Sequence, residues 1–148
     1  LGALYFISVR PKESDHIDNT TLNAAKIILK SDLKLCRSKA MQTGLAHKLV
    51  FTTGLNHYDM YYELPTQNAW TYYKESENMP NDAVIYQTTL PAAQVIFSIN
   101  GKPYEDPVDD NPTQSFDNEL SIQRTITIKT NSGSEKIVSI EPETGYTE

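Results

Sequence analysis

The residues Thr20-Thr-Leu-Asn-Ala-Ala-Lys-Ile-Ile-Leu-Lys-Ser-Asp-Leu-Lys-Leu-Cys-Arg-Ser-Lys-Ala-Met41 carry the strongest secondary-structure signal of this chain. Apolar residues recur in it at steps of three and four, a spacing that gathers side chains on one face of an α-helix. The residues of this apolar stripe are Leu22, Ala25, Leu29, Leu33, Cys36 and Ala40. We expect them to pack against the rest of the protein.

Both ends of this helix have candidate capping residues. Asn19, Thr20 and Thr21 offer side-chain oxygens for an N-cap, and Gly44 suits the left-handed position that follows many helices. The sequence therefore predicts a helix over residues 20–43. Its other face is polar and mostly cationic, which we interpret as a solvated surface; it carries Lys26, Lys30, Asp32, Lys34, Arg37 and Lys39.

Beyond Gly44 the helical period ends, and short runs rich in Val, Ile, Tyr, Phe and Thr alternate with turn residues, as in antiparallel sheets. These runs predict six or seven strands: Ala46–Thr53, Tyr58–Leu64, Ala69–Glu75, Ala83–Thr89, Gln94–Asn100, Ser121–Thr130 and Glu135–Glu141. Asn131-Ser-Gly133 predicts a tight hairpin between the last two. The expected fold class is α+β, with an N-terminal amphipathic helix packed against one or two antiparallel sheets.

The whole chain has the composition of an ordinary soluble domain. It has 148 residues, 39% of them hydrophobic, and a net charge of -6. We expect residues 20–148 to form a single globular domain. The acidic balance argues against a basic nucleic-acid-binding surface, and the lone Cys36 cannot form a disulfide within the chain.

The first nine residues, Leu1–Val9, form an apolar run that Arg10 and Pro11 end. A membrane-spanning helix needs about 20 such residues, so this run is too short to span. Two interpretations remain open from the residues alone. The run is either a buried first strand or the end of a longer transmembrane helix with Arg10 and Lys12 as its positive flank. A signal peptide is disfavoured because a basic leading region is missing.

The segment Lys102–Glu119 contains three prolines and six carboxylates, which predicts a long surface loop. Its acidic residues are Glu105, Asp106, Asp109, Asp110, Asp117 and Glu119. Within it, Asp106, Asp109 and Asp110 are weak candidates for calcium ligands, because calcium prefers such oxygens. The spacing does not match an EF-hand loop, so we favour a solvated acidic loop.

No catalytic pattern appears, and we expect neither an enzyme nor a cofactor. The three histidines, His16, His47 and His57, are far apart in sequence, which disfavours a shared metal site or a general base. Cys36 lies in the apolar stripe and is expected to pack as a small hydrophobe. Aromatic residues are dense in one region, where cross-strand packing is favoured over a binding platform: Tyr58, Tyr61, Tyr62, Trp70, Tyr72 and Tyr73.

In its order of features, the chain resembles the soluble part of type IV pilin-like proteins of the GspH/FimT class. The helix ends in Leu33-Lys-Leu-Cys-Arg37-Ser-Lys-Ala40 with Gly44 beyond it, similar to a phrase of that family. Trp70 lies in an early strand, and Ile96-Phe97-Ser-Ile-Asn-Gly101 resembles the family's strand ending in Phe-x-x-x-Gly. The close of the chain, Thr125–Ile128, Ile137–Ile140 and Thr144-Gly145, completes the likeness. The motif residues are Arg37, Gly44, Phe97, Gly101 and Gly145.

The resemblance implies that residues 1–19 are the end of a truncated N-terminal anchor and a linker, which favours helix over strand for Leu1–Val9. It also implies a single-pass protein of the bacterial inner membrane with its globular domain in the periplasm or extracytoplasmic space. The implied partners are other pilins or pseudopilins, contacted through the N-terminal helix, and the inner membrane, contacted through an anchor upstream of Leu1.

The family includes two roles, in filament assembly and in DNA uptake. The DNA-uptake branch uses an arginine-containing C-terminal stretch, whereas here that stretch is Thr144-Gly-Tyr-Thr-Glu148, with Glu141 and Glu143 nearby. Phosphate contacts need Lys or Arg, so nucleic acid is disfavoured as a partner. The leading hypothesis is a non-enzymatic minor pseudopilin or pilin of a type II secretion pseudopilus or type IV pilus. The alternatives are a FimT-like DNA-uptake pilin and a soluble extracytoplasmic domain that binds carbohydrate or peptide.

Overall fold

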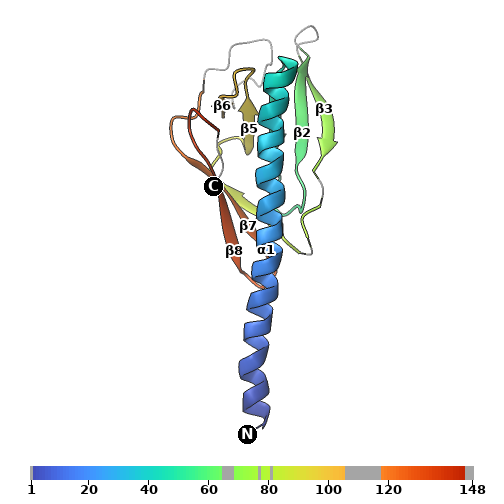
Figure 1. The fold of residues 1–148 in the computed structure, drawn as a ribbon, viewed down its shortest axis with the longest axis vertical. Helices are drawn as coiled ribbons and strands as arrows, with labels where there is room; N and C mark the ends of the chain where they lie inside the picture. Colours follow the sequence, from blue (N-terminus) through green and yellow to red (C-terminus); the bar gives the residue numbers. More distant parts are fainter. Residues whose placement is uncertain (1, 65–68, 77, 81, 106–117, 146–148) are drawn as a thin grey trace.

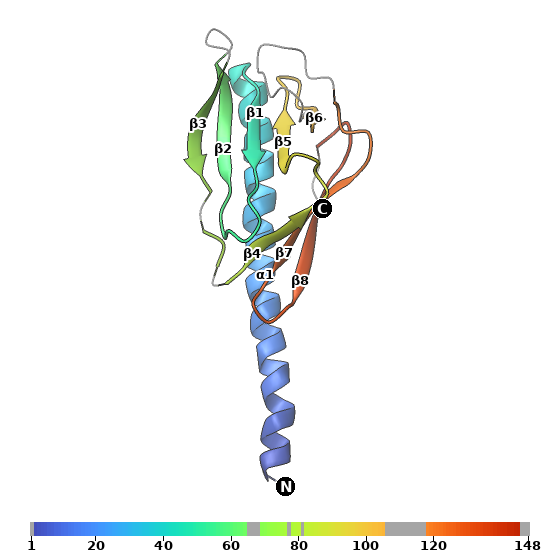
Figure 2. The same ribbon diagram turned by 180° about the vertical axis from the view of Figure 1, so that it is seen from behind.

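The computed structural model describes residues 2–64, 69–76, 78–80, 82–105 and 118–145, with side chains from residue 17 onward. One long helix, α1 (Gly2–Thr43), is followed by eight strands. Their bounds are β1 His47–Val50, β2 Asp59–Leu64, β3 Ala69–Glu75, β4 Val84–Thr88, β5 Gln94–Phe97, β6 Pro103–Tyr104, β7 Arg124–Lys129 and β8 Glu135–Ile140. Both sheets lie along the C-terminal part of α1, and a shorter N-terminal part projects beyond them (Figures 1 and 2).

The helix is longer at its N-terminal end than the capping residues predict. It begins at Gly2 and continues through Asn19, Thr20 and Thr21, so the predicted N-cap there is wrong. The strand interpretation of the apolar run is also wrong over Gly2–Val9, and the predicted linker before residue 20 is part of the same helix. In a helix interior, Asn and Thr are less favourable than Ala by at most about 0.7 kcal/mol of free energy, so a long helix can continue through them. They act as N-caps only where the backbone before them is not helical.

At its C-terminal end the helix stops as the sequence predicts. Gly44 has a φ of +69°, a conformation that glycine adopts without steric cost. Its N–H donates to the carbonyl oxygen of Ala40 at 3.1 Å, which satisfies one of the last free carbonyls of the helix. The turn that Gly44 makes directs the chain into β1.

The strands form two antiparallel sheets, and the predicted α+β class is confirmed. The larger has the order β3-β2-β1-β5-β6 and the smaller β4-β7-β8. Strand β6 is the one that the sequence pattern did not predict. It pairs with β5 through Ile96 and Phe97, so Pro103 and Tyr104, at the start of the predicted loop, form a short strand. Its first residue is a proline, which a sheet accepts on an edge strand such as this.

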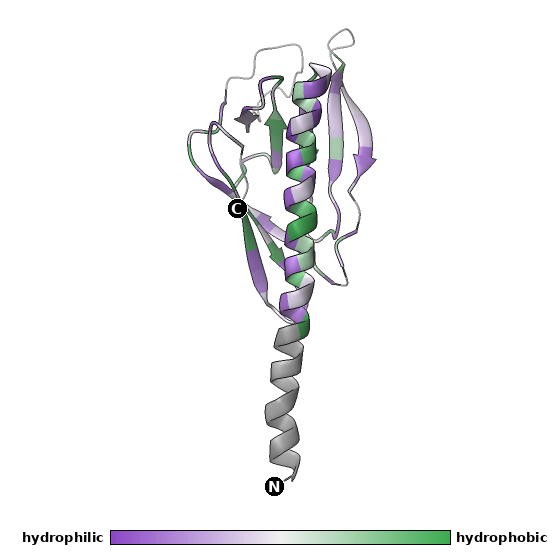
Figure 3. Ribbon diagram, viewed as in Figure 1, coloured by the Kyte–Doolittle hydropathy of each residue, from purple (hydrophilic) through white to green (hydrophobic). Residues whose placement is uncertain are grey.

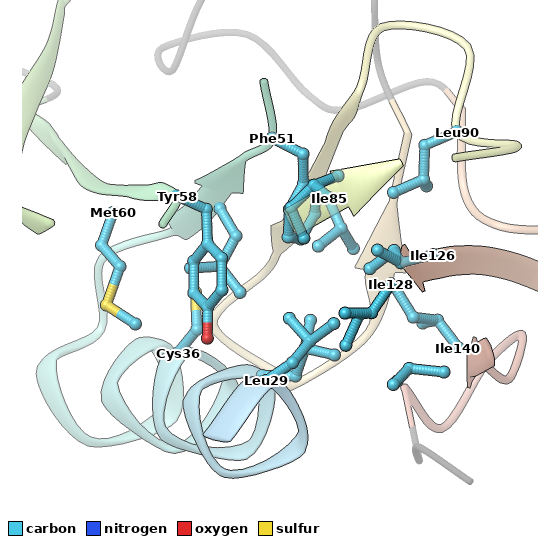
Figure 4. Packing of buried hydrophobic residues seen from close by; sticks show 14 of the residues in the cluster. Leu29, Cys36, Phe51, Tyr58, Met60, Ile85, Leu90, Ile126, Ile128 and Ile140 are labelled. Atoms are coloured by element: carbon cyan, nitrogen blue, oxygen red, sulfur yellow. The ribbon is translucent and has the colours of Figure 1, made fainter. Parts of the chain in front are cut away.

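The core lies where α1 meets the two sheets. All six stripe residues are at most 2% exposed. The larger sheet contributes Leu49 and Phe97 to this core, and the smaller sheet contributes Ile126 and Ile128. The close view in Figure 4 shows side chains of both sheets gathered over the helix. Polar and apolar residues alternate along the described turns of α1 (Figure 3), as expected for a helix with one face buried.

A polar clasp marks the point at which the helix leaves the domain. The carboxylate of Asp18 accepts hydrogen bonds from Oγ of Ser132 and, at 3.2 Å, from Oγ of Ser134, both in the β7–β8 turn. Further along the helix, Nζ of Lys136 donates to Oδ1 of Asn23 at 2.5 Å. At about 1.5 Å of rise per residue, the helical residues before Ile17 extend about 22 Å beyond this clasp.

Candidate assembly surface

The outward face of α1 runs along the whole length of the domain. Apolar side chains interrupt it, since Ile17 is 59% exposed and Ile27 is 65% exposed. In the part of the chain that the structure describes, no helix has the length and hydropathy of a membrane span. The exposed isoleucines are scattered singly among polar residues, as is normal on a protein surface.

Arg37 connects the helix to the loop after β5. Its Nε donates to the carbonyl oxygen of Gly101 at 3.0 Å, across 64 residues of sequence. Gly101 has a φ of +81°, and a Cβ atom there would lie 2.8 Å from Sδ of Met41. Glycine at this position therefore lets the loop approach the helix closely enough for Arg37 to bind it.

The last turn of the described chain packs at the same place. A Cβ atom on Gly145 would lie 2.8 Å from Cε1 of Phe97 and 3.6 Å from Cδ of Arg37. Four of the five motif residues, Arg37, Phe97, Gly101 and Gly145, are thus brought together from three segments: α1, β5 with the turn after it, and the last described turn. A Cβ atom on the fifth, Gly44, would meet nothing within 4 Å, so this glycine acts only at the helix end.

The two flanks of α1 differ in chemistry. On the flank beside Gly145, a hollow of about 320 Å³ is lined by Lys34, Arg37, Ser38 and Gly145. On the flank beside β3, a hollow of about 220 Å³ is lined by Ile27, Ile28, Ser31, Asp32 and Lys74. One flank is therefore cationic, while the other combines two isoleucines with one acidic and one basic residue.

The flank beside β3 is fixed to the larger sheet by a buried tyrosine. Tyr58 is 1% exposed, and its hydroxyl donates to Oδ2 of Asp32 at 2.7 Å. Burial, followed by the hydrogen bond and the charge of Asp32, raises the pKa of Tyr58 well above its usual value. Tyr58 therefore stays neutral and donates this hydrogen bond throughout the physiological pH range.

The other aromatic residues form cross-strand pairs, as the packing interpretation expects. Tyr61 and Tyr72 meet edge to face at 5.8 Å between ring centroids, and Tyr62 and Tyr73 do so at 6.4 Å. Such pairs stabilise a sheet by about 0.5–1.5 kcal/mol each. A cation also occupies this region, because Nζ of Lys48 lies 4.5 Å from the centroid of Trp70.

Lys48 is a buried cation that sequence reasoning missed. It is 4% exposed, and its Nζ also donates to Oε1 of Gln94 at 3.2 Å and lies 5.5 Å from the Tyr61 centroid. A buried lysine needs polar or π-electron partners to offset its desolvation. The ring faces of Trp70 and Tyr61 stabilise this cation, which reduces the aromatic surface left for an outside ligand.

The histidines do not come together. His47 begins β1 in the larger sheet, where its Nδ1 is 2.8 Å from the carbonyl oxygen of Leu45. It lines a mostly apolar hollow of about 320 Å³ together with Lys39, Thr43, Leu45, Tyr62 and Tyr73. Burial, opposed by the Leu45 hydrogen bond, lowers the pKa of His47. His57 lies beside Asn56 at 3.3 Å, and the side chain of His16 lies outside the described residues.

The other candidate site residues from the sequence are Cys36 and the acidic residues of the predicted loop. Cys36 is buried in the stripe, and desolvation raises the pKa of its thiol, so it is an inert core residue. Of the acidic loop, Glu105 and Glu119 are described, and the calcium candidates Asp106, Asp109 and Asp110 lie outside the described residues. Among the residues that are described, no cluster of His, Cys, Asp or Glu suits a metal.

The ends of the acidic loop are held together at its base. Nε of Arg124 lies 2.5 Å from Oε2 of Glu105 in a two-pronged ion pair whose side chains are largely buried. Lys102 pairs with Glu119 at 3.1 Å. The sequence contained no signal for these pairs or for the Asp18 clasp, because each joins residues that are far apart in the sequence.

Comparisons with known proteins show a likeness of structure. No protein-family model matches the chain, and no curated protein sequence does. Its structure is similar to that of the minor pseudopilin EpsH from the type 2 secretion system of Vibrio cholerae, with a TM-score of 0.59 and 11% identity over 86% of this chain and 94% of that one. It is also similar to the type IV minor pilin FimU of Pseudomonas aeruginosa, with a TM-score of 0.60 and 16% identity over 88% of each chain. The chain therefore has a pilin-like fold of the kind that the sequence resemblance predicted.

Proposed function

We propose that this chain is a non-enzymatic, pilin-type minor subunit that assembles into a type II secretion pseudopilus or a type IV pilus through its N-terminal helix. The observation that carries the proposal is the division of α1 into two parts. Residues 22–40 bury one face under both sheets, while the residues before Asp18 project away from them. A projecting helix attached rigidly to a domain is a suitable element for packing into a shared helical core.

The Asp18 clasp and Arg37 support this role by making the helix and domain one mechanical unit. The clasp holds α1 where it leaves the domain, and Arg37 holds it near its other end. A force or a packing contact on the projecting part is thereby transmitted to the sheets. We further propose an apolar inner-membrane anchor on the N-terminal side of α1, with the globular domain on the extracytoplasmic side.

Two other roles fit this chain less well than filament assembly does. They are DNA uptake and the binding of a carbohydrate or peptide by the aromatic residues. Residues 44–148 contain 6 Lys and Arg against 15 Asp and Glu, a net charge of -9. Such a surface repels phosphate backbones, whose binding depends on Lys and Arg contacts. The exposed rings of Tyr72 and Tyr73 are paired with neighbours instead of forming an open platform.

The proposal is tested by deleting the gene in the organism that encodes it and measuring three outputs: surface pili, secreted proteins and DNA uptake. Loss of piliation or of secretion, restored by the wild-type gene, supports it. The Leu29→Asp variant places a charge in the helix–sheet interface and should not restore piliation or secretion. The matched Gln42→Asp variant places the same charge on an exposed position of the same helix and should restore them. Unchanged pili and secretion with a loss of DNA uptake would instead favour the DNA-binding role.

A further inference from the structure

A hollow of about 320 Å³ opens between the C-terminal end of α1 and the first strands of the larger sheet. Its volume is at the lower end of the range for ligand pockets, about 300–1,000 Å³, which are mostly apolar and contain a few polar groups. The helix contributes two of its residues and the segment from β1 to β3 the other four: Lys39, Thr43, Leu45, His47, Tyr62 and Tyr73. A mostly apolar hollow of this size accepts one large side chain of a partner.

His47 supplies a buried hydrogen-bond acceptor to this hollow. It is 6% exposed, and its Nδ1 lies 2.8 Å from the carbonyl oxygen of Leu45. A carbonyl oxygen only accepts hydrogen bonds, so in the neutral ring Nδ1 carries the proton and Nε2 carries a lone pair. Burial lowers the pKa of His47, so the ring is neutral at pH 7. Among the residues that the structure describes, none donates to Nε2, and a buried acceptor in this state is stabilised by a donor from outside.

The same hollow carries a cation and two aromatic rings. Within the described part of the chain, Lys39 forms no ion pair with a carboxylate. The rings of Tyr62 and Tyr73 meet edge to face at 6.4 Å between centroids, and Tyr73 remains 45% exposed. Paired in this way, the rings do not form an open platform, but they wall one side of the hollow opposite α1. The walls therefore suit an occupant with a flat apolar body and a negative charge beside it.

Together these groups define the chemistry of the occupant. The tyrosine rings require an apolar or aromatic body, Nε2 of His47 requires an N–H or O–H donor, and Lys39 requires a carboxylate. Tyrosine and tryptophan side chains combine an aromatic body with a donor, and a neighbouring Asp or Glu supplies the carboxylate. We infer that this hollow is a docking site for a Tyr or Trp side chain, next in sequence to Asp or Glu, of a neighbouring pilin-type subunit.

A second copy of this chain is not a suitable source of that side chain. Among the described residues, each Tyr that is next to an Asp or Glu belongs to a pair with a buried or ion-paired member. These pairs are Tyr58-Asp59, with the tyrosine 1% exposed, Tyr62-Glu63, with the glutamate 7% exposed, and Tyr104-Glu105, with the glutamate ion-paired to Arg124. The occupant is therefore a different subunit, as expected for a minor component. In naming that partner, the inference rests on the proposed function.

Peptide titration tests the chemistry of the hollow. The purified chain is titrated with the peptide acetyl-Gly-Tyr-Asp-Gly-amide while the ¹⁵N resonances of the histidine rings are followed by NMR. We expect saturable binding that shifts Nε2 of His47 and leaves His57, which lies outside the hollow, unchanged. A peptide with Phe in place of Tyr lacks the O–H donor and should bind about fivefold more weakly. No saturable shift of Nε2, or equal affinities for the Tyr and Phe peptides, would overturn the inference.

The role of Lys39 is tested with the same peptide. Replacing its Asp by Asn should weaken binding about threefold at low salt, because a carboxylate is lost. Lys39→Gln should remove this preference for Asp. The matched variant Lys34→Gln, which lies on the opposite flank of α1, should retain it. A preference for Asp that survives Lys39→Gln would contradict the assigned role of this lysine and overturn the inference.

Photo-cross-linking in the organism that encodes the chain identifies the occupant. A photoreactive phenylalanine analogue replaces Tyr73, and in a matched control it replaces Tyr72, which is 51% exposed but pairs with Tyr61 outside the hollow. We expect adducts specific to position 73, mapped by mass spectrometry to a Tyr or Trp beside an acidic residue of another pilin-type subunit. Equal adducts at the two positions, adducts at other kinds of segment, or none at position 73 would overturn the inference.

Failure of this docking site is distinguishable from failure of the proposed function. If piliation or secretion depends on the gene but the peptide and cross-linking experiments fail, the docking site is refuted and the proposed function stands. If the peptide binds as expected but piliation and secretion do not depend on the gene, the proposed function fails. Neighbouring subunits are then refuted as the occupant of the hollow.

Discussion

Arg37 and Gly101 are 64 residues apart in sequence, and the Nε of the arginine donates to the carbonyl oxygen of the glycine at 3.0 Å. This bond ties the last turns of the helix to the loop that follows β5. Arg37→Lys keeps the charge but loses the planar donor group, so it cannot reproduce the bond. We expect it to lower the free energy of unfolding by about 1 kcal/mol in urea titrations. Ser38→Ala, one residue along on the exposed face, should change it little.

Two motif glycines with similar backbone conformations should differ in their tolerance of a side chain. Gly44 has a φ of +69° in open space, and Gly145 has a φ of +64° against the ring of Phe97. An alanine at either position carries a backbone cost of about 1 kcal/mol. Phe97 is fully buried and its ring has little room to move, so Gly145→Ala should cost roughly a further 1–3 kcal/mol. Equal losses in the two variants, measured by denaturant titration, would contradict the close packing at Gly145.

The apolar stripe is expected to carry much of the stability of the helix–sheet interface. Leu29 is fully buried between the helix and the smaller sheet. Leu29→Ala should lower the free energy of unfolding by about 2–5 kcal/mol, because it removes buried methyl groups and leaves a cavity. Ile27→Ala, two residues away and exposed, should change it by less than about 0.5 kcal/mol. Thermal unfolding of both variants measures the difference, and similar losses would show that α1 is oriented differently.

The buried ring of His47 should make stability fall as the pH is lowered. Its folded-state pKa lies below the unfolded value of about 6.5, so the unfolded chain binds more protons in the interval between the two. Stability from this residue is therefore complete above about pH 6.5 and is lost as the pH falls toward the folded-state pKa. Between about pH 7.5 and about pH 5.5, wild type should lose more stability than His47→Gln. An identical pH dependence in the two chains, followed by urea titration, would contradict the effect of burial on His47.

The helices and strands that were predicted correctly are those whose residues follow a clear local periodicity. The stripe from Leu22 to Ala40 is buried throughout, and β3 spans the predicted residues Ala69–Glu75. The errors have physical causes. Asn19 and its neighbours are cap-forming residues that a long helix also tolerates, and β6 is a two-residue strand that begins with a proline.

The contacts between distant segments were beyond the reach of local pattern. The family resemblance pointed to Arg37, Phe97, Gly101 and Gly145 as motif residues, but only the fold shows that they meet. The Lys48 cation site, the Arg124–Glu105 pair and the division into two sheets are also long-range properties. No spacing rule for helices or strands encodes them, since each depends on how the sheets are placed around α1.

The most direct test of assembly through α1 is site-specific photo-cross-linking in the organism that encodes the chain. A photoreactive amino acid replaces Ile27, which is exposed on the helix, and in a matched control replaces Tyr86 on the smaller sheet. We expect Ile27 adducts to contain other pilin-type subunits, identified by mass spectrometry, and Tyr86 adducts to be depleted in them. Adducts with pilin-type subunits from Tyr86 and none from Ile27 would contradict assembly through the helix.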